Sequence, residues 1–574
     1  MSGRAMKHLP AVLIAVALGW IAGAKGVGLA PWSVLATLGA AVALAIRHRS
    51  GTIRWQASLA WLSALLCWAT LLAAVRPVAA ADAARAVGTG VMALLLAAVV
   101  QRPRAALWSR TAVAMAGSCT GVWLAVERLA LGKRPLGPFD NANQAAVIAL
   151  LAVAVAPWVG KRWFVRLGVA AVSLAGVVCS GSRAALLGAL VLGAVWAVVE
   201  GRGALRWGVV VLSVLAGLGL AWRLASDRDP LRFERVRIWS TAIRAALAEM
   251  PLGCAPGGFE DAALPHNFAR EGEYARYSRS VTLAESDFLQ LAVTLGLPGL
   301  LLAAGLAASL VRQLGGNRAA GLGVGAVVLV TSAVHTQLCF PVVCWTAVLA
   351  VAGCCARPRG RPLRLNTAQT VTSAMLLASA AFVALVRPEE LSLSPRVLVE
   401  RAQKLAVGAR GSDTRLADGE AAAWQATALR PRFALGWRVL GGIRLDRAVL
   451  RGDVTLAAAA LQAFARARAA DPHDAWSAFG EGQARQVVGD LEGSTQAYRS
   501  ATALEPNFVE AWVELGLTQL ERGEISAAKD SLERAERARR LSQRTRFVGN
   551  YERGLAEVDS ARLRRLRSAL GRQS

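Results

Sequence analysis

Acidic side chains are scarce over the first two thirds of the sequence, and those present are gathered in one place. Only fourteen of the 38 Asp and Glu residues precede position 389, and ten of these lie between Asp227 and Asp287. The apolar runs on either side lack charge at mid-span depth, and they show neither matched inverted halves nor paired interrupted spans. These absences argue against a transporter.

Cysteine is also sparse, with eight in 574 residues. Most of them fall within the apolar runs and Cys254 alone lies in the long loop, so no disulfide framework is indicated. No cluster of Cys, His and carboxylate residues has metal-ligand spacing, and we expect a protein that works without a metal or a cofactor.

Long hydrophobic runs dominate the first two thirds of the sequence. Of all residues 55% are hydrophobic, and runs of roughly 17 to 24 residues, the length that crosses a bilayer, recur from Leu9 to Val386. We predict an all-α fold with a polytopic helical membrane domain over residues 1–388 and about 12–13 spans, because helices satisfy their own backbone in lipid. The candidate spans lie near 9–24, 30–46, 56–75, 86–100, 111–131, 143–160, 164–180, 184–199, 207–223, 287–311, 319–337, 340–356 and 367–387.

The formal charge of +27 is distributed so that it sets orientation in the membrane and does not indicate nucleic-acid binding. Basic residues cluster in alternate connections between spans, and by the positive-inside rule these connections face the cytoplasm. The long loop at 225–286 falls on the opposite side, so we predict that it is extracytoplasmic. An odd number of spans then places the C-terminal region, residues 389–574, on the same outer side.

A 34-residue period appears after the last predicted span. Phe464, Tyr498 and Leu532 are each 34 residues apart, and a Trp-x-x-(Leu/Phe)-Gly segment precedes each of them. This pattern resembles tetratricopeptide repeats, with the clearest units at about 435–542 and an irregular unit before them. We predict a soluble helical solenoid over 389–574 whose concave surface binds a protein partner that the sequence does not identify.

Four segments stand out from the apolar background, and all fall on the outer side of the predicted topology. Residues 137–144 (Gly-Pro-Phe-Asp-Asn-Ala-Asn-Gln) and 180–185 (Ser-Gly-Ser-Arg-Ala-Ala) each open a span. Residues 235–239 (Arg-Val-Arg-Ile-Trp) lie in the long loop, and residues 285–290 (Glu-Ser-Asp-Phe-Leu-Gln) lead into a further span. In this order the segments resemble the O-antigen ligase and polymerase family over roughly residues 100–355.

The resemblance implies a glycosyltransferase of the bacterial inner membrane. Members of this family transfer a glycan from an undecaprenyl-diphosphate carrier to a hydroxyl group of a growing polysaccharide, of lipid A core or of a protein. They act on the outer face of the membrane in polysaccharide and lipopolysaccharide assembly, and we expect a metal-independent reaction that inverts the anomeric centre. The implied partners are the carrier-linked glycan, its acceptor and membrane lipid, with no nucleic acid.

Arginine and carboxylate side chains in these segments suit that chemistry. A leaving diphosphate concentrates negative charge, so we predict that the paired donors of Arg183 and Arg235 bind it, with Arg237 beside them. The acceptor hydroxyl must lose its proton to a general base. The family pattern has His where this sequence has Glu285, and a carboxylate can serve if burial or a neighbour such as Asp287, itself predicted to bind substrate, raises its pKa.

Four further side chains complete the predicted site. His266 is a second candidate for the base, although the Phe-Leu-Gln that follows the family's histidine is missing there. Asn141 and Asn143 could bind substrate or could cap a helix. His335 lies near the outer end of a predicted span and could bind substrate, but we favour a packing or hydrogen-bonding role for it.

Each charged candidate also has a purely structural interpretation. Arg183 could anchor the end of a span at the membrane interface. Arg235 and Arg237 could pair with loop acids such as Glu234 on a solvated helix. Glu285 could be a first-turn acid that the helix dipole favours.

Ligase, polymerase and protein O-oligosaccharyltransferase activities all fit the sequence, which does not identify the acceptor. A non-catalytic membrane scaffold or a transporter, either with a protein-binding repeat domain, is the alternative from another class. Convergence of Arg183, Arg235 and Glu285 on one outward-facing cavity would favour the enzyme.

Overall fold

Two compact units make up the chain. The computed structural model describes residues 52–76, 80–99, 103–139, 141–200, 234–313, 318–354, 361–364, 394–409, 411–547 and 549–572, with Trp207, Val211 and Val214 between them. The membrane unit comprises residues 1–75, 82–256 and 283–387, and the repeat unit comprises residues 76–81, 257–282 and 388–574. The predicted spans near 9–24, 30–46 and 367–387 lie outside the described residues, as does nearly all of the span near 207–223.

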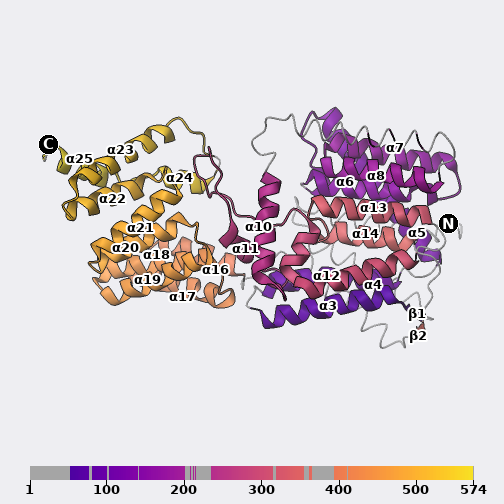
Figure 1. Ribbon diagram of the computed structural model, residues 1–574, viewed down its shortest axis with the longest axis horizontal. Coiled ribbons are helices and arrows are strands. Elements are labelled where there is room, and N and C mark those ends of the chain that lie inside the picture. Colours follow the sequence, from indigo (N-terminus) through magenta and orange to yellow (C-terminus); the bar gives the residue numbers. More distant parts are fainter. Residues whose placement is uncertain are drawn as a thin grey trace. The chain divides into compact units, whose positions relative to one another are not determined.

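Helices fill the membrane unit (Figure 1). Each predicted span inside the described residues contains a helix, and four helices are long and apolar enough to cross a membrane: Ala57–Val75, Trp163–Ser180, Arg183–Glu200 and Asp287–Gln313. The predicted all-α membrane region is thereby confirmed. The helices are α3 (Ala57–Val75), α4 (Ala80–Val99), α5 (Pro103–Ala125), α6 (Ala142–Val155), α7 (Trp163–Ser180), α8 (Arg183–Glu200), α10 (Glu234–Glu249), α12 (Asp287–Gln313), α13 (Arg318–Val334) and α14 (Pro341–Cys354).

Helix α6 is the centre of the membrane unit. Every residue from Gln144 to Val155 is buried, as is typical of a helix that is apolar on all sides. Helices α5, α7, α8, α13 and α14 pack around it. A 3₁₀ turn, Gly137–Phe139, leads into α6 and buries Phe139 in the same core. The polar segment that precedes α6 is therefore held against the centre of the unit.

Helices α5 and α7 approach each other closely where both carry glycine. A Cβ atom added at Gly176 would lie 2.3 Å from the Cα atom of Gly121. A Cβ atom at Gly121 would lie 2.7 Å from the carbonyl oxygen of Val172. Small residues allow such backbone contact between membrane helices, whose association gains little from leaving water.

Two short strands join distant parts of the membrane unit. Strand β1 (Thr52–Trp55) pairs antiparallel with β2 (Arg361–Arg364), and Trp55 lies opposite Arg361. Both strands carry arginine, and both belong to connections for which the positive-inside rule predicts the cytoplasmic side. Their pairing agrees with that prediction, because paired strands must lie on one side of the bilayer.

Antiparallel helix pairs build the repeat unit (Figure 1). The pairs are α16 (Pro395–Val407) with α17 (Asp413–Leu429), α18 (Ala434–Arg451) with α19 (Val454–Ala470), α20 (Ala475–Val487) with α21 (Leu491–Leu504), and α22 (Val509–Glu521) with α23 (Ile525–Ser542). Helices α24 (Asn550–Ala556) and α25 (Ser560–Gly571) follow. The predicted solenoid is confirmed, with the irregular leading unit at α16 and α17.

The 34-residue period reflects packing between successive hairpins. Phe464 and Tyr498, at equivalent positions of α19 and α21, are 2% and 0% exposed. A Cβ atom at Gly441 would lie 2.9 Å from the Phe464 ring, and one at Gly480 would lie 2.4 Å from it. The repeated glycines therefore admit an aromatic side chain between first helices of neighbouring hairpins.

Part of the long loop belongs to the repeat unit. The sequence placed the whole of 225–286 with the membrane domain, whereas residues 257–282 form one compact unit with residues 388–574. This segment contains α11 (Phe259–Ala263) and a 3₁₀ turn, Leu264–His266, and it buries Tyr274 in a hydrophobic cluster with residues of the repeats. The difference arises because its contacts are distant in sequence, and no local pattern indicates them.

Candidate functional site

A close backbone contact fixes the position of α12 beside α10. Helix α12 is interrupted at Gly296, which has φ 62° and ψ −158°. A Cβ atom on Gly296 would lie 2.2 Å from the carbonyl oxygen of Pro251, which follows α10, and Leu297 donates its N–H to that oxygen at 2.9 Å. Only glycine permits this dihedral and this approach. This contact holds the segment after α10 against the interruption inside α12.

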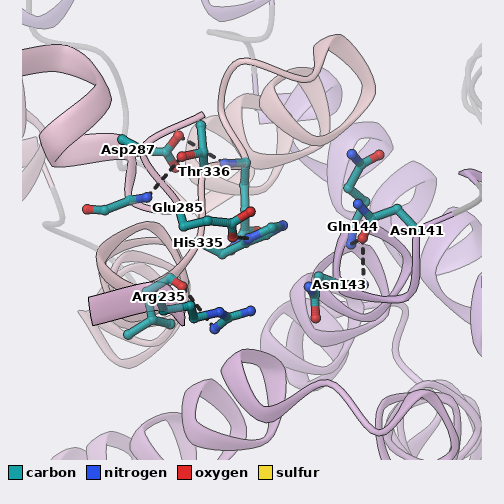
Figure 2. A network of polar contacts seen from close by, with 12 residues as sticks. Asn141, Asn143, Gln144, Arg235, Glu285, Asp287, His335 and Thr336 are labelled. Atoms are coloured by element: carbon teal, nitrogen blue, oxygen red, sulfur yellow. Dashed lines mark hydrogen bonds and ion pairs between the residues drawn. The ribbon is translucent and has the colours of Figure 1, made fainter. Parts of the chain in front are cut away.

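Glu285, just before α12, is hydrogen-bonded to His335, just after α13 (Figure 2). Nδ1 of His335 lies 2.5 Å from Oε2 of Glu285. Because an ionised carboxylate can only accept, Nδ1 carries the proton and donates it. The His335 side chain is 6% exposed and the Glu285 side chain is 26% exposed. Glu285 is therefore the member of the pair that a ligand can reach.

The backbone holds Glu285 in an uncommon conformation. Its φ of 50° lies in the left-handed region, which is costly for a residue other than glycine. Trp239 of α10 donates Nε1–H to the carbonyl oxygen of Glu285 at 3.1 Å, and Ser286 donates its N–H to Oγ1 of Thr336 at 2.9 Å. Such conformations concentrate at functional sites, which supports a functional role for Glu285.

Asp287 organises the turn that carries His335. Its Oδ1 accepts the backbone N–H groups of Gln337 and Leu338 at 2.9 and 3.0 Å. Nε2 of His335 and both amide atoms of the Gln337 side chain are buried and have no hydrogen-bond partner among the described residues. Buried polar atoms are normally hydrogen-bonded. These three atoms of the turn could therefore still form hydrogen bonds to a ligand.

The pKa of Glu285 is lowered, whereas the sequence analysis considered a raised value. Burial would raise its pKa, but the hydrogen bond and electrostatic interaction with His335, together with the charge of Arg235, hold the pKa below its usual value. The condition set for Glu285 as the base, a pKa raised by burial or by a neighbour such as Asp287, is therefore not met, because His335 and Arg235 outweigh the effect of burial while Asp287 binds backbone N–H groups. Glu285 is ionised at neutral pH and can accept a proton.

Arg235, in the first turn of α10, lies beside this pair. Its guanidinium donates to the carbonyl oxygen of Val334, the neighbour of His335, at 3.3 Å. Figure 2 shows the guanidinium below the side chains of His335 and Glu285 in this view. The structure thus brings together two of the predicted catalytic residues, Arg235 and Glu285, and adds His335 to them.

A second polar cluster lies at the starts of α6 and α8. Oδ1 of Asn141 accepts the backbone N–H groups of Asn143 and Gln144 at 2.9 and 3.4 Å, so Asn141 caps α6. Oγ of Ser182 donates to Oδ1 of Asn143 at 2.7 Å. Asn143 thereby links α6 to the start of α8, whose first residue is the exposed Arg183.

The two remaining predicted site residues lie on α10 and in the repeat unit. Arg237 is exposed on α10. His266 ends a 3₁₀ turn in the repeat unit. His266 is therefore grouped with the repeats and not with the unit that contains Glu285.

The stretch from α7 into α12 corresponds to a known family. Residues 168–304 match the family model described as O-Antigen ligase. The chain carries an O-antigen ligase domain. This domain includes Arg183, Arg235 and Glu285, whereas Asn143 and His335 lie outside the matched residues of the O-antigen ligase model.

No curated protein matches the chain. Among solved structures, the crystal structure of MamA has 14% identity and a TM-score of 0.23, over 32% of this chain and 100% of that one. The crystal structure of yeast Tom70 has 10% identity and a TM-score of 0.21, over 82% of this chain and 92% of that one. These likenesses are too distant to bear on the function.

Sequence reasoning singled out both Glu285 and His335 but did not pair them. They are 50 positions apart and lie at the ends of different helices. Only the packing of α12 against α13 brings them together. The available signal was their shared location at the predicted outer ends of two consecutive spans.

Proposed function

We propose that the protein is a membrane glycosyltransferase of the O-antigen ligase or polymerase type that transfers a glycan from an undecaprenyl-diphosphate carrier to a hydroxyl group. The O-antigen ligase domain supports glycan transfer as the class of reaction. Within the chain, the observation that carries the proposal is the hydrogen bond between Glu285 and His335, with Arg235 beside it.

In this proposal, Glu285 accepts the proton of the attacking hydroxyl group. Its lowered pKa keeps the carboxylate ionised, and its partial exposure makes it reachable. His335 occupies Oε2 and so leaves Oε1 for the hydroxyl proton. As the O–H bond breaks, the hydroxyl oxygen forms its bond to the anomeric carbon of the donor glycan.

Arginine side chains receive the leaving diphosphate. The bond from the anomeric carbon to the diphosphate oxygen breaks, and the electron pair leaves with the diphosphate. Arg235, whose charge interacts with Glu285, is proposed to pair its guanidinium with the phosphate oxygens. Arg183, at the N-terminus of α8 where the helix dipole is positive, is the second proposed phosphate ligand. Attack opposite the leaving group inverts the anomeric centre.

The other predicted substrate-binding residues divide into two groups. Arg237 and Asn143 are proposed to contact the substrate directly, since Arg237 is exposed near Arg235 on α10 and Asn143 lies next to Ser182 at the start of α8. Asn141 and Asp287 bind backbone N–H groups and are proposed to act by shaping the site. The site is proposed to face the outside of the bacterial inner membrane.

Mass analysis of carrier-linked and surface glycans in a deletion strain tests this function. The strain is complemented with the wild type or with Glu285→Gln at equal protein levels. We expect the wild type to restore glycan transfer and Glu285→Gln to fail. Single repeat units left on the carrier identify a polymerase, and finished polymer left on the carrier identifies a ligase. An unchanged glycan profile in the deletion strain would refute the proposal.

A further inference from the structure

The loop segment 257–282 binds to equivalent positions of successive repeats. In each turn from the second helix of one hairpin to the first helix of the next, a polar residue precedes proline: Arg430-Pro431, Asp471-Pro472 and Glu505-Pro506. The segment contacts residues in all three of these turns. Its binding therefore follows the periodicity of the solenoid and is not confined to one hairpin.

At the first of these turns, Arg430 binds Asp261. Nε of Arg430 donates to Oδ2 of Asp261 and Nη2 donates to Oδ1, each at 2.8 Å. The side chains are 3% and 4% exposed. Glu260 adds a second link, because it accepts from Arg396 at 2.7 Å. A paired guanidinium–carboxylate contact of this kind fixes orientation as well as distance.

At the second turn, aromatic rings meet. The ring of Tyr277 stacks on the ring of His473, with centroids 4.8 Å apart and an interplanar angle of 5°. His473 also hydrogen-bonds to the backbone of Pro265. One side chain of the solenoid thus contacts two distant points of the segment and holds the segment in a folded conformation.

At the third turn, the repeats bind the backbone of the segment. Glu505 accepts the N–H groups of Arg276 and Tyr277 at 2.7 and 2.8 Å. Asn507 donates Nδ2–H to the carbonyl oxygen of Tyr274 at 2.7 Å and accepts from the Tyr274 hydroxyl at 3.2 Å. Tyr274 itself is buried. A buried carboxylate that accepts two consecutive N–H groups specifies the backbone path, so this contact is not a chance surface encounter.

We infer that the repeat unit binds segment 257–282 of its own chain as a resident ligand, and that Arg430 and Glu505 are positioning residues for Glu285. The positioning role rests on the proposed function. Only Leu283 and Ala284 separate the segment from Glu285, and two or three residues reach at most about 10 Å. Release of the segment therefore removes a restraint close to a residue with strained φ.

The same contacts require the repeats and the outer loop to lie on one side of the membrane. They also give the inter-repeat turns an occupant. A separate protein could bind these turns only by displacing the segment.

Trypsin cleavage of the purified full-length protein after Arg270 tests the docking. Arg270 is 7% exposed, so cleavage requires local opening of the segment. We expect Arg430→Ala and Glu505→Gln to accelerate this cleavage about tenfold or more, because cleavage follows the population of the open form. Arg564→Ala and Glu533→Gln, at exposed positions of the same unit, are the matched controls and should leave the rate unchanged.

A double substitution distinguishes loss of the Arg430–Asp261 ion pair from general destabilisation of the repeat unit. Arg430→Ala leaves Asp261 buried without its partner, whereas Asp261→Ala with Arg430→Ala removes both charges. We expect the double variant to be cleaved more slowly than Arg430→Ala alone. Cleavage rates of Arg430→Ala and Glu505→Gln equal to the wild-type rate would overturn the docking.

Glycan transfer by the same proteins tests positioning. For Arg430→Ala and Glu505→Gln we expect kcat to fall about tenfold while KM for the carrier-linked glycan changes less than twofold, since the substrate-binding side chains are untouched. Released segments with wild-type kcat would overturn the positioning role. Absence of transfer by the wild type would instead refute the proposed function, and the trypsin result would still decide the docking.

Discussion

Replacement of His335 should move the pH dependence of glycan transfer through its effect on Glu285. Among the contributions to the pKa of Glu285, burial raises it, and the interactions with His335 and Arg235 lower it. His335→Ala removes the hydrogen bond while Glu285 stays largely buried. The pKa of Glu285 should therefore rise, and the carboxylate should become protonated at a higher pH than in the wild type.

The size of the effect follows from the contact at 2.5 Å. A hydrogen bond to a charged group contributes about 1.5–3 kcal/mol, which corresponds to a change of about 10- to 100-fold in rate if it acts in the transition state. Glu285→Gln removes the base itself and should cost about 10²- to 10⁴-fold. The variant that combines His335→Ala with Glu285→Gln should transfer glycan no more slowly than Glu285→Gln alone, because His335 acts through Glu285.

The assay is transfer of a carrier-linked glycan by purified protein between pH 4.5 and 8. In the wild type the pKa of Glu285 lies below the usual value for glutamate, so its carboxylate stays ionised over most of this pH range. Protonation of Glu285 should therefore reduce transfer only at the acid end. In His335→Ala the acid-side loss should begin at higher pH. His335→Gln, which keeps a donor for Glu285, should lie between the two. An acid limb that is identical in His335→Ala and in the wild type would refute this account, as would transfer by Glu285→Gln within threefold of wild type.

Three further outcomes are expected. Arg235→Ala should lower kcat about 10²- to 10³-fold with little recovery by Arg235→Lys, because a point charge does not reproduce paired donors; full recovery by lysine would contradict this. Gly296→Ala should lower the melting temperature of the membrane unit, since its Cβ would lie 2.2 Å from a carbonyl oxygen at φ 62°; an unchanged melt would argue against that contact. Burial, and then Asp474, raise the pKa of Asp471 to about 7. This contribution to repeat-unit stability is full in acid and is lost as pH rises through 7, so Asp471→Asn should flatten the dependence of the melting temperature on pH.

Features that repeat along the chain were predictable from the sequence. Apolar runs recur at bilayer length, and helices α3 to α8 and α12 to α14 follow them within the described residues. The spacing of Phe464 and Tyr498 indicated the hairpins because each residue fills the same space in its own repeat. Periodicity is a local signal, so it can be recognised in the sequence without knowledge of any contact in the folded protein.

Features that depend on one pair of distant residues were not predictable. Glu285 was found through a family pattern, but the direction of its pKa shift depends on His335 and Arg235, which lie on other elements. The binding of Asp261 by Arg430 joins positions 169 residues apart. Asp261 belongs to no motif, and the repeat pattern that includes Arg430 does not indicate what this side chain binds, so the sequence offered no reason to divide the long loop between two units.

Because segment 257–282 binds three consecutive inter-repeat turns, the length of the loop must match the number of hairpins between those turns. Asp261 and Tyr274 meet turns at Arg430 and Asn507, and a whole hairpin inserted between these turns would increase the distance that the loop must span. Chains of this architecture can therefore gain or lose a hairpin at that point only together with a matching change in loop length.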